Sequence, residues 1–226
     1  MGEGADVLDF EGALFDLDGT LLDSMWVWAK IDEEFLSRRG IEVPPDYFHK
    51  IAPMTFRQTA EYTRDLFGLK ESPEEIMAEW NHMAMDAYVN EVGLKPYAKE
   101  YLKHLKENGV KLGTVTSLPD ILSEPVLRRC GIYHLFDAFT TTDEVNRGKS
   151  NPCLYILAAR KLGVSPEKCV VFEDTLDGVK GILAAGMRAW GVYDIHYGSY
   201  EDEMKELCEV YVRDFRQLLP LIDARL

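Results

Sequence analysis

A short apolar segment that ends in two acidic residues constrains the fold of this chain most strongly. Residues 13–15 form an apolar run that is typical of a buried strand, and Gly19 breaks the run shortly afterwards. Asp16 and Asp18 stand at positions i and i+2, so on extended backbone their side chains point to the same side. Carboxylates this close repel each other unless a cation, a shared proton or a reacting group separates them. We therefore expect this strand to end at a ligand-binding crevice of an α/β sheet.

The second half of the chain alternates strand-like and helix-like segments. Alternation of this kind is typical of a parallel sheet with helices on both faces. We therefore expect an α/β fold. The expected strands are residues 110–115, 136–140, 169–172, 187–192 and 210–212, and the expected helices are residues 97–108, 119–130, 152–162 and 175–185.

The segment that follows the first strand has a different, mainly helical pattern. Thr55 is expected to begin one helix that ends at Gly68, and Ser72, which a proline and two acids follow, is a strong start for another. The segment is much longer than a simple crossover between strands requires. We therefore predict two domains, a core of residues 1–24 and 93–226 and an inserted helical cap of residues 25–92.

The charge and composition of the chain exclude several classes of partner. Its 226 residues carry a formal net charge of −14 at pH 7, whereas binding to nucleic acid depends on basic surface. No apolar run approaches the length of about 20 residues that a bilayer-spanning helix needs. We therefore expect neither nucleic acid nor a membrane as a partner, and a monomer needs no further assumption.

Cysteine usage and the amino terminus favour a cytoplasmic location. The four cysteines are widely spaced and form none of the C-x-x-C pairs of a metal site. Residues 1–6 are acidic and lack the basic start and the apolar stretch of a signal peptide. We therefore expect a cytoplasmic protein with reduced thiols.

Residues 14–24, LFDLDGTLLDS, resemble the first motif of the haloacid dehalogenase (HAD) superfamily, D-x-D-G-T-L-x-D-S. Residues 115–117 resemble the second motif, a strand that ends in threonine or serine, and residues 148–152 the third, a lysine shortly before a proline. Residues 170–175 resemble the fourth motif, a strand that delivers two acids. The resemblance spans residues 10 to about 192 and implies a Rossmann-like parallel sheet core with a small inserted α-helical cap.

The resemblance implies a phosphoryl-transfer site that contains magnesium. Asp16 would be the nucleophile, because a carboxylate that attacks phosphorus forms an aspartyl-phosphate and divides one displacement into two easier ones. Asp18 would protonate the leaving oxygen and then deprotonate water. Magnesium prefers oxygen ligands, and the family pattern implies Asp16, the backbone carbonyl of Asp18 and Asp174. Glu173 would be a further ligand or an outer partner of the metal's waters.

The other motifs predict residues that bind the substrate. Thr116 would offer a hydroxyl and Ser117 a backbone N–H to phosphoryl oxygens, although either residue could instead cap the helix expected near Pro119. Lys149 would offset negative charge on the nucleophile and on the transferring group. Arg57, near the start of a cap helix, would reach a distal anionic group of the substrate or form a surface salt bridge.

The predicted activity is a magnesium-dependent phosphatase that acts on a small organic phosphate monoester. The first alternative is a β-phosphoglucomutase, which shares the core motifs but relies on a cap histidine twelve positions after the nucleophile, where this chain has Trp28. Mutases of this kind also carry a Lys-Gly pair before the cap arginine, whereas residues 53–56 here are Pro-Met-Thr-Phe. Both departures favour a phosphatase. A non-catalytic binding module on the same fold is the other alternative, because fold alone does not settle function.

Overall fold

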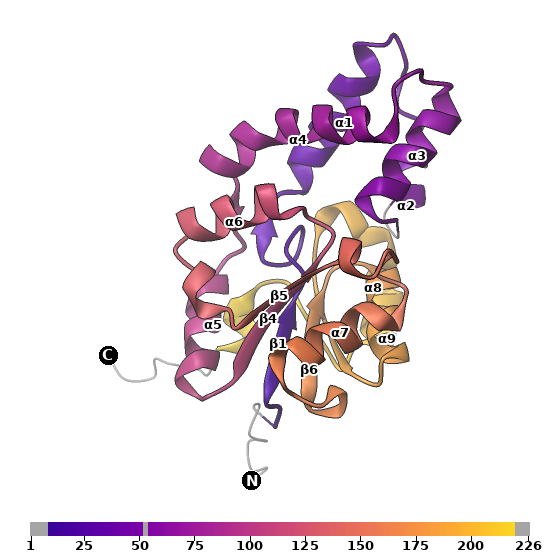
Figure 1. The fold of residues 1–226 in the computed structure, drawn as a ribbon. Helices are drawn as coiled ribbons and strands as arrows, with labels where there is room; N and C mark the ends of the chain where they lie inside the picture. The colour runs from indigo at the N-terminus through magenta and orange to yellow at the C-terminus, as the bar shows by residue number, and fades with distance from the viewer. Residues whose placement is uncertain (1–8, 52–53, 220–226) are drawn as a thin grey trace.

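Six parallel strands form the central sheet, in the order β5-β4-β1-β6-β7-β8 (Figure 1). The computed structural model describes residues 9–51 and 54–219. From β1 the chain first builds towards β4 and β5 and then returns to build towards β6, β7 and β8 on the other side. The carboxyl end of β1 therefore lies at the point where the topology reverses, which is where open α/β sheets bind ligands. The strands are β1 (Gly12–Phe15), β4 (Lys111–Thr116), β5 (Ala138–Thr141), β6 (Cys169–Glu173), β7 (Arg188–Val192) and β8 (Val210–Val212).

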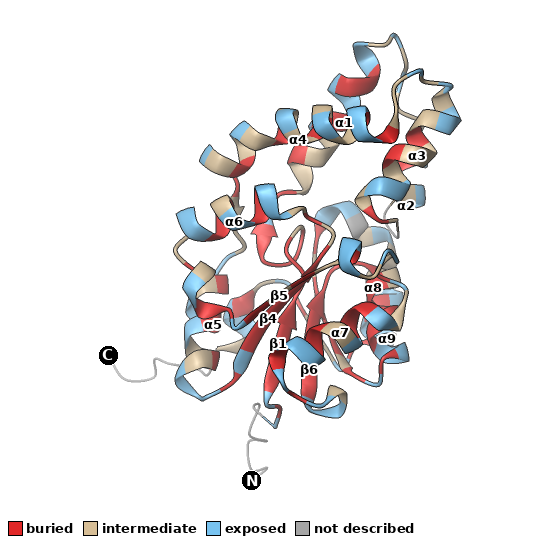
Figure 2. Ribbon diagram, viewed as in Figure 1, coloured by how far each residue is buried: buried red, intermediate tan, exposed pale blue. Residues whose placement is uncertain are grey.

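Alternate strand residues face opposite sides of the sheet, and different helices cover each side (Figures 1 and 2). Phe15 and Phe172 stack with ring centroids 4.3 Å apart, in the core that also contains residues of α5 and α6. Leu14 and Val171 belong to a second core, on the side of α7, α8 and α9. Because both faces are covered, β1 and β6 are continuously apolar or buried. These helices are α5 (Ala98–Glu107), α6 (Asp120–Arg129), α7 (Pro152–Leu162), α8 (Leu176–Ala184) and α9 (Glu201–Leu207).

The expected α/β architecture is confirmed, and the expected core strands and helices are present with bounds that differ by at most two residues. Two short antiparallel strands that were not expected, β2 (Leu22–Asp23) and β3 (Gly93–Leu94), form a separate pair between the sheet and the helical insertion. Short 3-10 helices complete the described part of the chain: η1 (Tyr133–Leu135), η2 (Thr142–Glu144), η3 (Pro166–Lys168), η4 (Ile195–Tyr200) and η5 (Phe215–Leu218).

The helical insertion lies over the edge of the sheet at which β1 ends (Figure 1). Thr55 and Ser72 begin α3 and α4 as expected, each forms a capping box, and Gly68 ends α3 in a left-handed conformation with φ 63°. The short helix α2 was not expected. The domain bounds at 24/25 and 92/93 stay predictions. The cap helices are α1 (Met25–Ser37), α2 (Tyr47–Ile51), α3 (Phe56–Phe67) and α4 (Pro73–Asn90).

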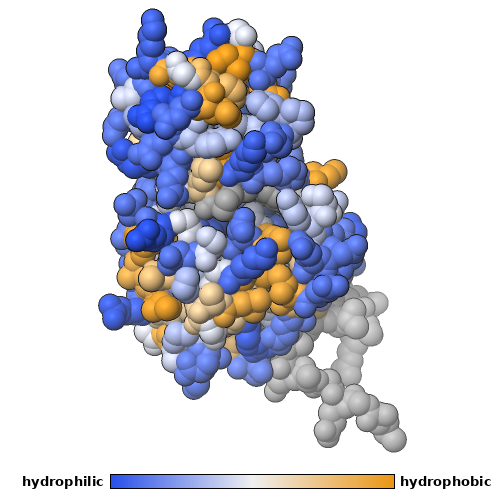
Figure 3. All heavy atoms as spheres, turned by 90° about the vertical axis from the view of Figure 1, so that its right-hand side faces the viewer, coloured by the Kyte–Doolittle hydropathy of each residue, from blue (hydrophilic) through white to orange (hydrophobic). Residues whose placement is uncertain are grey.

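The surface is mainly hydrophilic on the face shown in Figure 3, where apolar side chains gather in separate patches on both the cap and the core. Scattered exposed apolar residues are normal for a folded protein. None of the helices in residues 9–51 and 54–219 is long and apolar enough to cross a membrane. The acidic residues 1–6, on which the prediction about a signal peptide rests, lie outside the described residues.

Close packing of α8 fixes the loop that precedes α7. A Cβ atom added to Gly181 would lie 2.0 Å from the carbonyl oxygen of Lys149 and 2.8 Å from the ring of Tyr155. The Tyr155 hydroxyl in turn donates a hydrogen bond of 3.1 Å to the carbonyl oxygen of Gly178, in the same helix. Helix α8 therefore packs directly against the backbone of Lys149 and leaves no space for a side chain between them.

Gly181→Ala should lower the free energy of unfolding by about 1–3 kcal/mol, because the added methyl group meets backbone that cannot move without disturbing α7. Gly93→Ala is the matched control, since a Cβ atom there meets nothing within 4 Å. Denaturant unfolding followed by circular dichroism measures both variants. Equal stability of the two variants would contradict this account of the packing.

Candidate active site

The carboxyl ends of three neighbouring strands bring the predicted site residues together. Asp16 follows β1, Thr116 ends β4, and Glu173 ends β6 immediately before Asp174. The backbone N–H of Asp16 donates a hydrogen bond of 3.0 Å to the carbonyl oxygen of Phe172, which extends the parallel pairing of β1 with β6. Residues far apart in the sequence therefore meet because the parallel register places their strand ends side by side.

Three buried carboxylates form a cluster at this edge. Asp16, Glu173 and Asp174 are at most 3% exposed, and each offers an oxygen that lies within 4.8 Å of the others. Burial raises the pKa of Asp16 to about 7, although the neighbouring Lys149 charge acts in the opposite direction. Burial and the neighbouring Glu173 and Asp16 raise the pKa of Asp174 well above its usual value. The cluster therefore holds more negative charge than its surroundings neutralise.

Lys149 is the cation that faces this cluster. Its Nζ lies 2.7 Å from Asp16 Oδ1 and 3.2 Å from Glu173 Oε2. Burial alone would lower the pKa of Lys149, but Asp16 and Glu173 hold it well above the usual range. One ammonium group nevertheless cannot neutralise three carboxylates, so a further cation or proton is required.

The donor set fits a magnesium ion. Asp174 Oδ2 is buried and accepts no hydrogen bond from any described residue. A buried carboxylate oxygen without a partner is costly, and an oxygen-binding divalent cation would compensate it. Gly19, with φ 78°, passes so close that a Cβ atom there would lie 2.2 Å from this oxygen. The other oxygen of Asp174 accepts a hydrogen bond of 2.9 Å from the Thr20 hydroxyl, which orients the carboxylate.

Asp18 is held by side chains from both the core and the cap. Its Oδ1 accepts a hydrogen bond of 2.6 Å from the Ser24 hydroxyl and another from the Tyr88 hydroxyl of α4. Tyr88 in turn accepts a hydrogen bond of 2.8 Å from Trp28 Nε1 of α1. Burial raises the pKa of Asp18, and the two donated hydrogen bonds oppose that rise. The cap therefore contacts Asp18 directly.

The structure distinguishes the roles considered for Thr116 and Ser117. Helix α6 begins at Asp120 with Pro119 as its N-cap residue and without a capping side chain. Thr116 Oγ1 instead accepts a hydrogen bond of 3.0 Å from the backbone N–H of Leu118, which shapes the loop, and the hydroxyl hydrogen is left to donate elsewhere. Neither residue is thus used as the helix cap.

Arg57 lies outside the set of residues that line the central cavity. Its side chain is 46% exposed, and its guanidinium nitrogens lie 2.7 Å from Glu74 Oε1 and 3.8 Å from Glu61 Oε1. This geometry favours the surface salt bridge over the substrate contact that the sequence also allowed. An exposed pair of this kind contributes little to stability.

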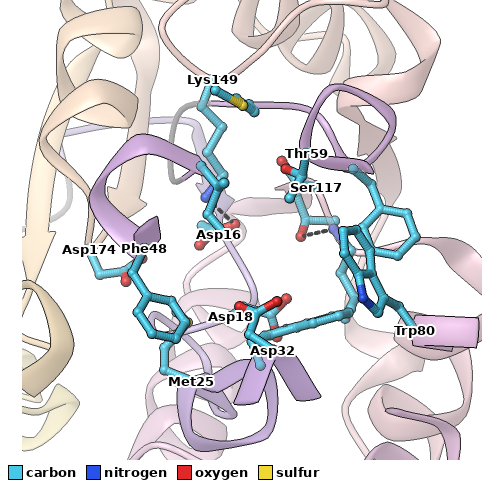
Figure 4. Close-up of a pocket in the computed structure, with 16 residues that line it drawn as sticks. Asp16, Asp18, Met25, Asp32, Phe48, Thr59, Trp80, Ser117, Lys149 and Asp174 are labelled. Carbon is cyan, nitrogen blue, oxygen red and sulfur yellow. Dashed lines mark hydrogen bonds and ion pairs between the residues drawn. The ribbon is translucent and has the colours of Figure 1, made fainter. Parts of the chain in front are cut away.

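A cavity of about 150 Å³ joins the core residues to the cap (Figure 4). Its core end carries Asp16, Asp18, Lys149 and Asp174, with Thr116 and Ser117 beside them. Its cap end is mainly apolar and aromatic but includes one acid. The cap residues that line it are Met25, Trp28, Asp32, Phe48, Ile51, Met54, Phe56, Thr59 and Trp80.

Comparison with known proteins identifies the family. A model of haloacid dehalogenase-like hydrolases matches residues 10–186. The chain belongs to this family. It is 28% identical over 183 residues to a phosphorylated carbohydrates phosphatase of Thermotoga maritima, covering 80% of this chain and 85% of the relative. It is 35% identical over 181 residues to hexitol phosphatase A of Escherichia coli, covering 78% of this chain and 80% of the relative.

Solved structures agree on the fold of this HAD-like hydrolase. The crystal structure of a β-phosphoglucomutase from Clostridium difficile has a TM-score of 0.79 and 21% sequence identity, and the match covers 93% of each chain. Identity this low establishes the fold alone. The predicted family, fold class and enzymatic nature of the chain are thus confirmed.

Four side chains of this HAD-like hydrolase were missed as site residues in the sequence. Thr20 and Ser24 stand within the first motif, but only the fold shows that their hydroxyls hold Asp174 and Asp18. Tyr88 fits the apolar stripe of α4 and therefore resembles a core residue. Asp32 lies among the charged residues of α1, where an acid is usually solvated. The sequence contains no signal that identifies Tyr88 or Asp32 as a site residue.

Asp174→Asn should raise the melting temperature of the metal-free protein by about 2–4 °C, roughly 1 kcal/mol for a chain of this size, because it removes one of three repelling carboxylates. Magnesium should raise the melting temperature of the parent protein but not of this variant, since a ligand stabilises the state that binds it. Thermal unfolding with EDTA and with MgCl2 measures both effects.

Asp177→Asn is the matched control, because Asp177 lies in the first turn of α8 and outside the acidic cluster. This variant should retain the magnesium response of the parent. The same response to magnesium in Asp174→Asn would contradict the assignment of Asp174 to the metal site.

Proposed function

We propose that this HAD-like hydrolase is a magnesium-dependent phosphatase that hydrolyses a small sugar or polyol phosphate through an aspartyl-phosphate on Asp16. The observation that carries the proposal is the buried Asp16 carboxylate, which lies 2.7 Å from Lys149 Nζ and faces a cavity beside two further acids. The names of the relatives, which include a carbohydrate phosphatase and a hexitol phosphatase, support the substrate class.

In the first step, an oxygen of Asp16 attacks phosphorus and the bond to the ester oxygen breaks. Asp18 gives its proton to that oxygen, so the leaving group departs as a neutral alcohol. Lys149, the Thr116 hydroxyl and the Ser117 backbone N–H bind the phosphoryl oxygens, on which negative charge is spread. Lys149 and the acids already lie at one end of the cavity, so few side chains have to move.

In the second step, Asp18 accepts a proton from a water molecule as that water attacks the aspartyl-phosphate. Inorganic phosphate leaves, and Asp16 returns to its carboxylate form. Asp18 thereby regains the proton that it gave up in the first step. One carboxyl group serves as acid and then as base because both reactions take place on the same side of the phosphoryl group.

A magnesium ion would be held by Asp16, Asp174 and the carbonyl oxygen of Asp18, and when bound it would supply positive charge that stabilises the phosphoryl oxygens. Glu173 Oε1 accepts hydrogen bonds of 2.6 Å from the Thr175 hydroxyl and 3.2 Å from Lys149 Nζ. Its other oxygen, Oε2, is buried and accepts no hydrogen bond from any described residue. Glu173 would therefore position Lys149 through one oxygen and keep the other available to the metal or to the metal's waters.

The surroundings of Trp28 support hydrolysis rather than a mutase reaction. Its indole N–H donates to Tyr88, and an indole group does not exchange protons near neutral pH as a histidine would. A non-catalytic module is disfavoured because the nucleophile, the acid, the lysine and the metal carboxylate are all present. A parallel assay with β-glucose 1-phosphate, followed for phosphate and for glucose 6-phosphate, tests the mutase alternative directly.

Some expectations stay predictions from the sequence. The chain is expected to be a cytoplasmic monomer with reduced thiols, and its partner is expected to be a small phosphate ester rather than nucleic acid or a membrane. The net charge of −14 and the spacing of the cysteines support these expectations.

Asp16→Asn should reduce phosphate release from every ester to background, because the amide cannot form the phosphorylated intermediate. The far-ultraviolet circular dichroism spectrum should match that of the parent. A panel of sugar, polyol and nucleotide phosphates, assayed with MgCl2 and with EDTA, measures the effect and the metal requirement. Turnover in Asp16→Asn comparable to the parent would refute the assignment of the nucleophile.

Tyr88→Phe removes the cap hydroxyl that donates a hydrogen bond to Asp18 but keeps the aromatic ring. We expect kcat to fall about 10-fold for alkyl phosphates, a loss typical of one hydrogen bond to a charged group, and much less for p-nitrophenyl phosphate. The difference arises because a good leaving group needs little protonation. Asp18→Asn should give the same pattern with larger losses.

Tyr101→Phe is the control for this series, because the Tyr101 hydroxyl is buried in the core and has no hydrogen-bond partner among the described residues. Its kcat values should equal those of the parent. Equal losses in Tyr88→Phe for good and poor leaving groups would show that Tyr88 acts on the structure of the cap rather than on Asp18.

A further inference from the structure

Asp32 is a buried acid in the cap that the proposed reaction does not use. It lies on α1, is 6% exposed, and has neither a hydrogen bond nor an ion pair with any described residue. Its side chain is among those that line the central cavity (Figure 4). Burial alone raises its pKa to about 7. A buried carboxyl group without a partner is costly, so its position in the cavity indicates that a ligand supplies the partner.

Aromatic side chains surround the cap end of the cavity. Trp28 lies one helical turn before Asp32, so both face the same side of α1. The ring of Phe56 lies 5.8 Å from that of Trp28 and 5.7 Å from that of Trp80, measured between centroids. Aromatic faces bind the C–H surface of a carbon skeleton, while a single ionised acid among them accepts hydrogen bonds from groups that carry a proton.

Charge in the cavity argues against a second anionic group on the substrate. Lys149 is the one cationic side chain among the described residues that line the cavity, and it is already paired with Asp16 and Glu173. Arg57 is paired at the surface. A second phosphate or a carboxylate at the cap end would therefore meet Asp32 without a compensating cation.

We propose that Asp32 determines substrate specificity by accepting a hydrogen bond from a hydroxyl or ammonium group on the carbon skeleton of the phosphate ester. The cavity thus takes esters whose far end is neutral or cationic and rejects esters that carry a second anion. The inference rests on the proposed phosphatase activity. Enzyme kinetics test it together with that activity, and measurements of ligand binding test it independently of catalysis.

The kinetic test compares kcat/KM for four esters in the parent and in Asp32→Asn and Asp32→Leu. Sorbitol 6-phosphate carries hydroxyls, glucosamine 6-phosphate carries an ammonium group, 6-phosphogluconate carries a second anion, and phenyl phosphate carries no donor. The parent should prefer at least one of the first two to 6-phosphogluconate by at least about 10-fold, and Asp32→Leu should lose about 10-fold or more on that ester, mainly through KM. Phenyl phosphate should change less than about 2-fold.

Asp32→Asn distinguishes a hydroxyl donor on the substrate from an ammonium donor. Asparagine keeps an acceptor oxygen but no charge, so a loss confined to Asp32→Leu would identify a hydroxyl donor. A comparable loss in both variants, on glucosamine 6-phosphate alone, would identify an ammonium donor. Glu33→Gln, at an exposed neighbouring position on α1, should leave every value unchanged. An equal loss on phenyl phosphate in the Asp32 variants, or no loss on any ester, would overturn the proposal.

Calorimetric binding of sorbitol 6-phosphate and glucosamine 6-phosphate to Asp16→Asn, with and without Asp32→Leu, tests the inference without catalysis. At least one of them should bind, and Asp32→Leu should weaken that binding about 10-fold or more. Unchanged binding would overturn the role of Asp32 even if the enzyme is a phosphatase. Weakened binding in a protein that releases phosphate from none of these esters or of the sugar, polyol and nucleotide phosphates of the activity panel would uphold the role of Asp32 while refuting the proposed function.

Discussion

Repulsion among buried carboxylates at one edge of the sheet is the constraint on which the rest of this structure depends. Parallel pairing of β1 with β6 forces Asp16, Glu173 and Asp174 together, and Lys149 neutralises only part of their charge. The two apolar cores that cover the sheet stabilise the strands that hold the acids in place. The fold therefore maintains an unfavourable charge arrangement that a bound cation would relieve.

Asp16 and Asp18 depend on different parts of the molecule. The sheet backbone holds Asp16, and the lysine beside it is fixed by the close packing of α8. The carboxylate of Asp18, in contrast, is shared between Ser24 of the core and Tyr88 of the cap. A movement of the cap would therefore disturb the acid and leave the nucleophile unchanged. In the proposed reaction, cap closure would therefore control protonation of the leaving group while the phosphoryl-binding end stays preorganised.

The core could be predicted almost completely from the sequence, and the cap end of the site could not. Residues such as Asp16 and Lys149 sit in short motifs at strand and helix ends, where local pattern and spatial position coincide. Asp32 and Tyr88 lie within helices, and their function depends on which face turns towards the cavity. The substrate contact of Arg57 stays a prediction, because its charge fits either a substrate contact or a surface salt bridge and the fold pairs it with a surface acid. Pattern cannot resolve contacts that only tertiary packing creates.

The charge of the cavity orients a substrate as well as selecting it. A chain with net charge −14 repels anions overall, so in the proposed function a phosphate ester would gain favourable interactions where Lys149 and a bound metal reverse the local field. At the cap end of the cavity, the proposed role of Asp32 is to repel an anion and to accept a hydrogen bond from a hydroxyl or ammonium group. An ester with one phosphate and a hydroxyl-rich or amino-bearing skeleton thus has one favourable orientation, with phosphorus next to Asp16. An ester with anions at both ends has none, because either orientation places one anion against Asp32.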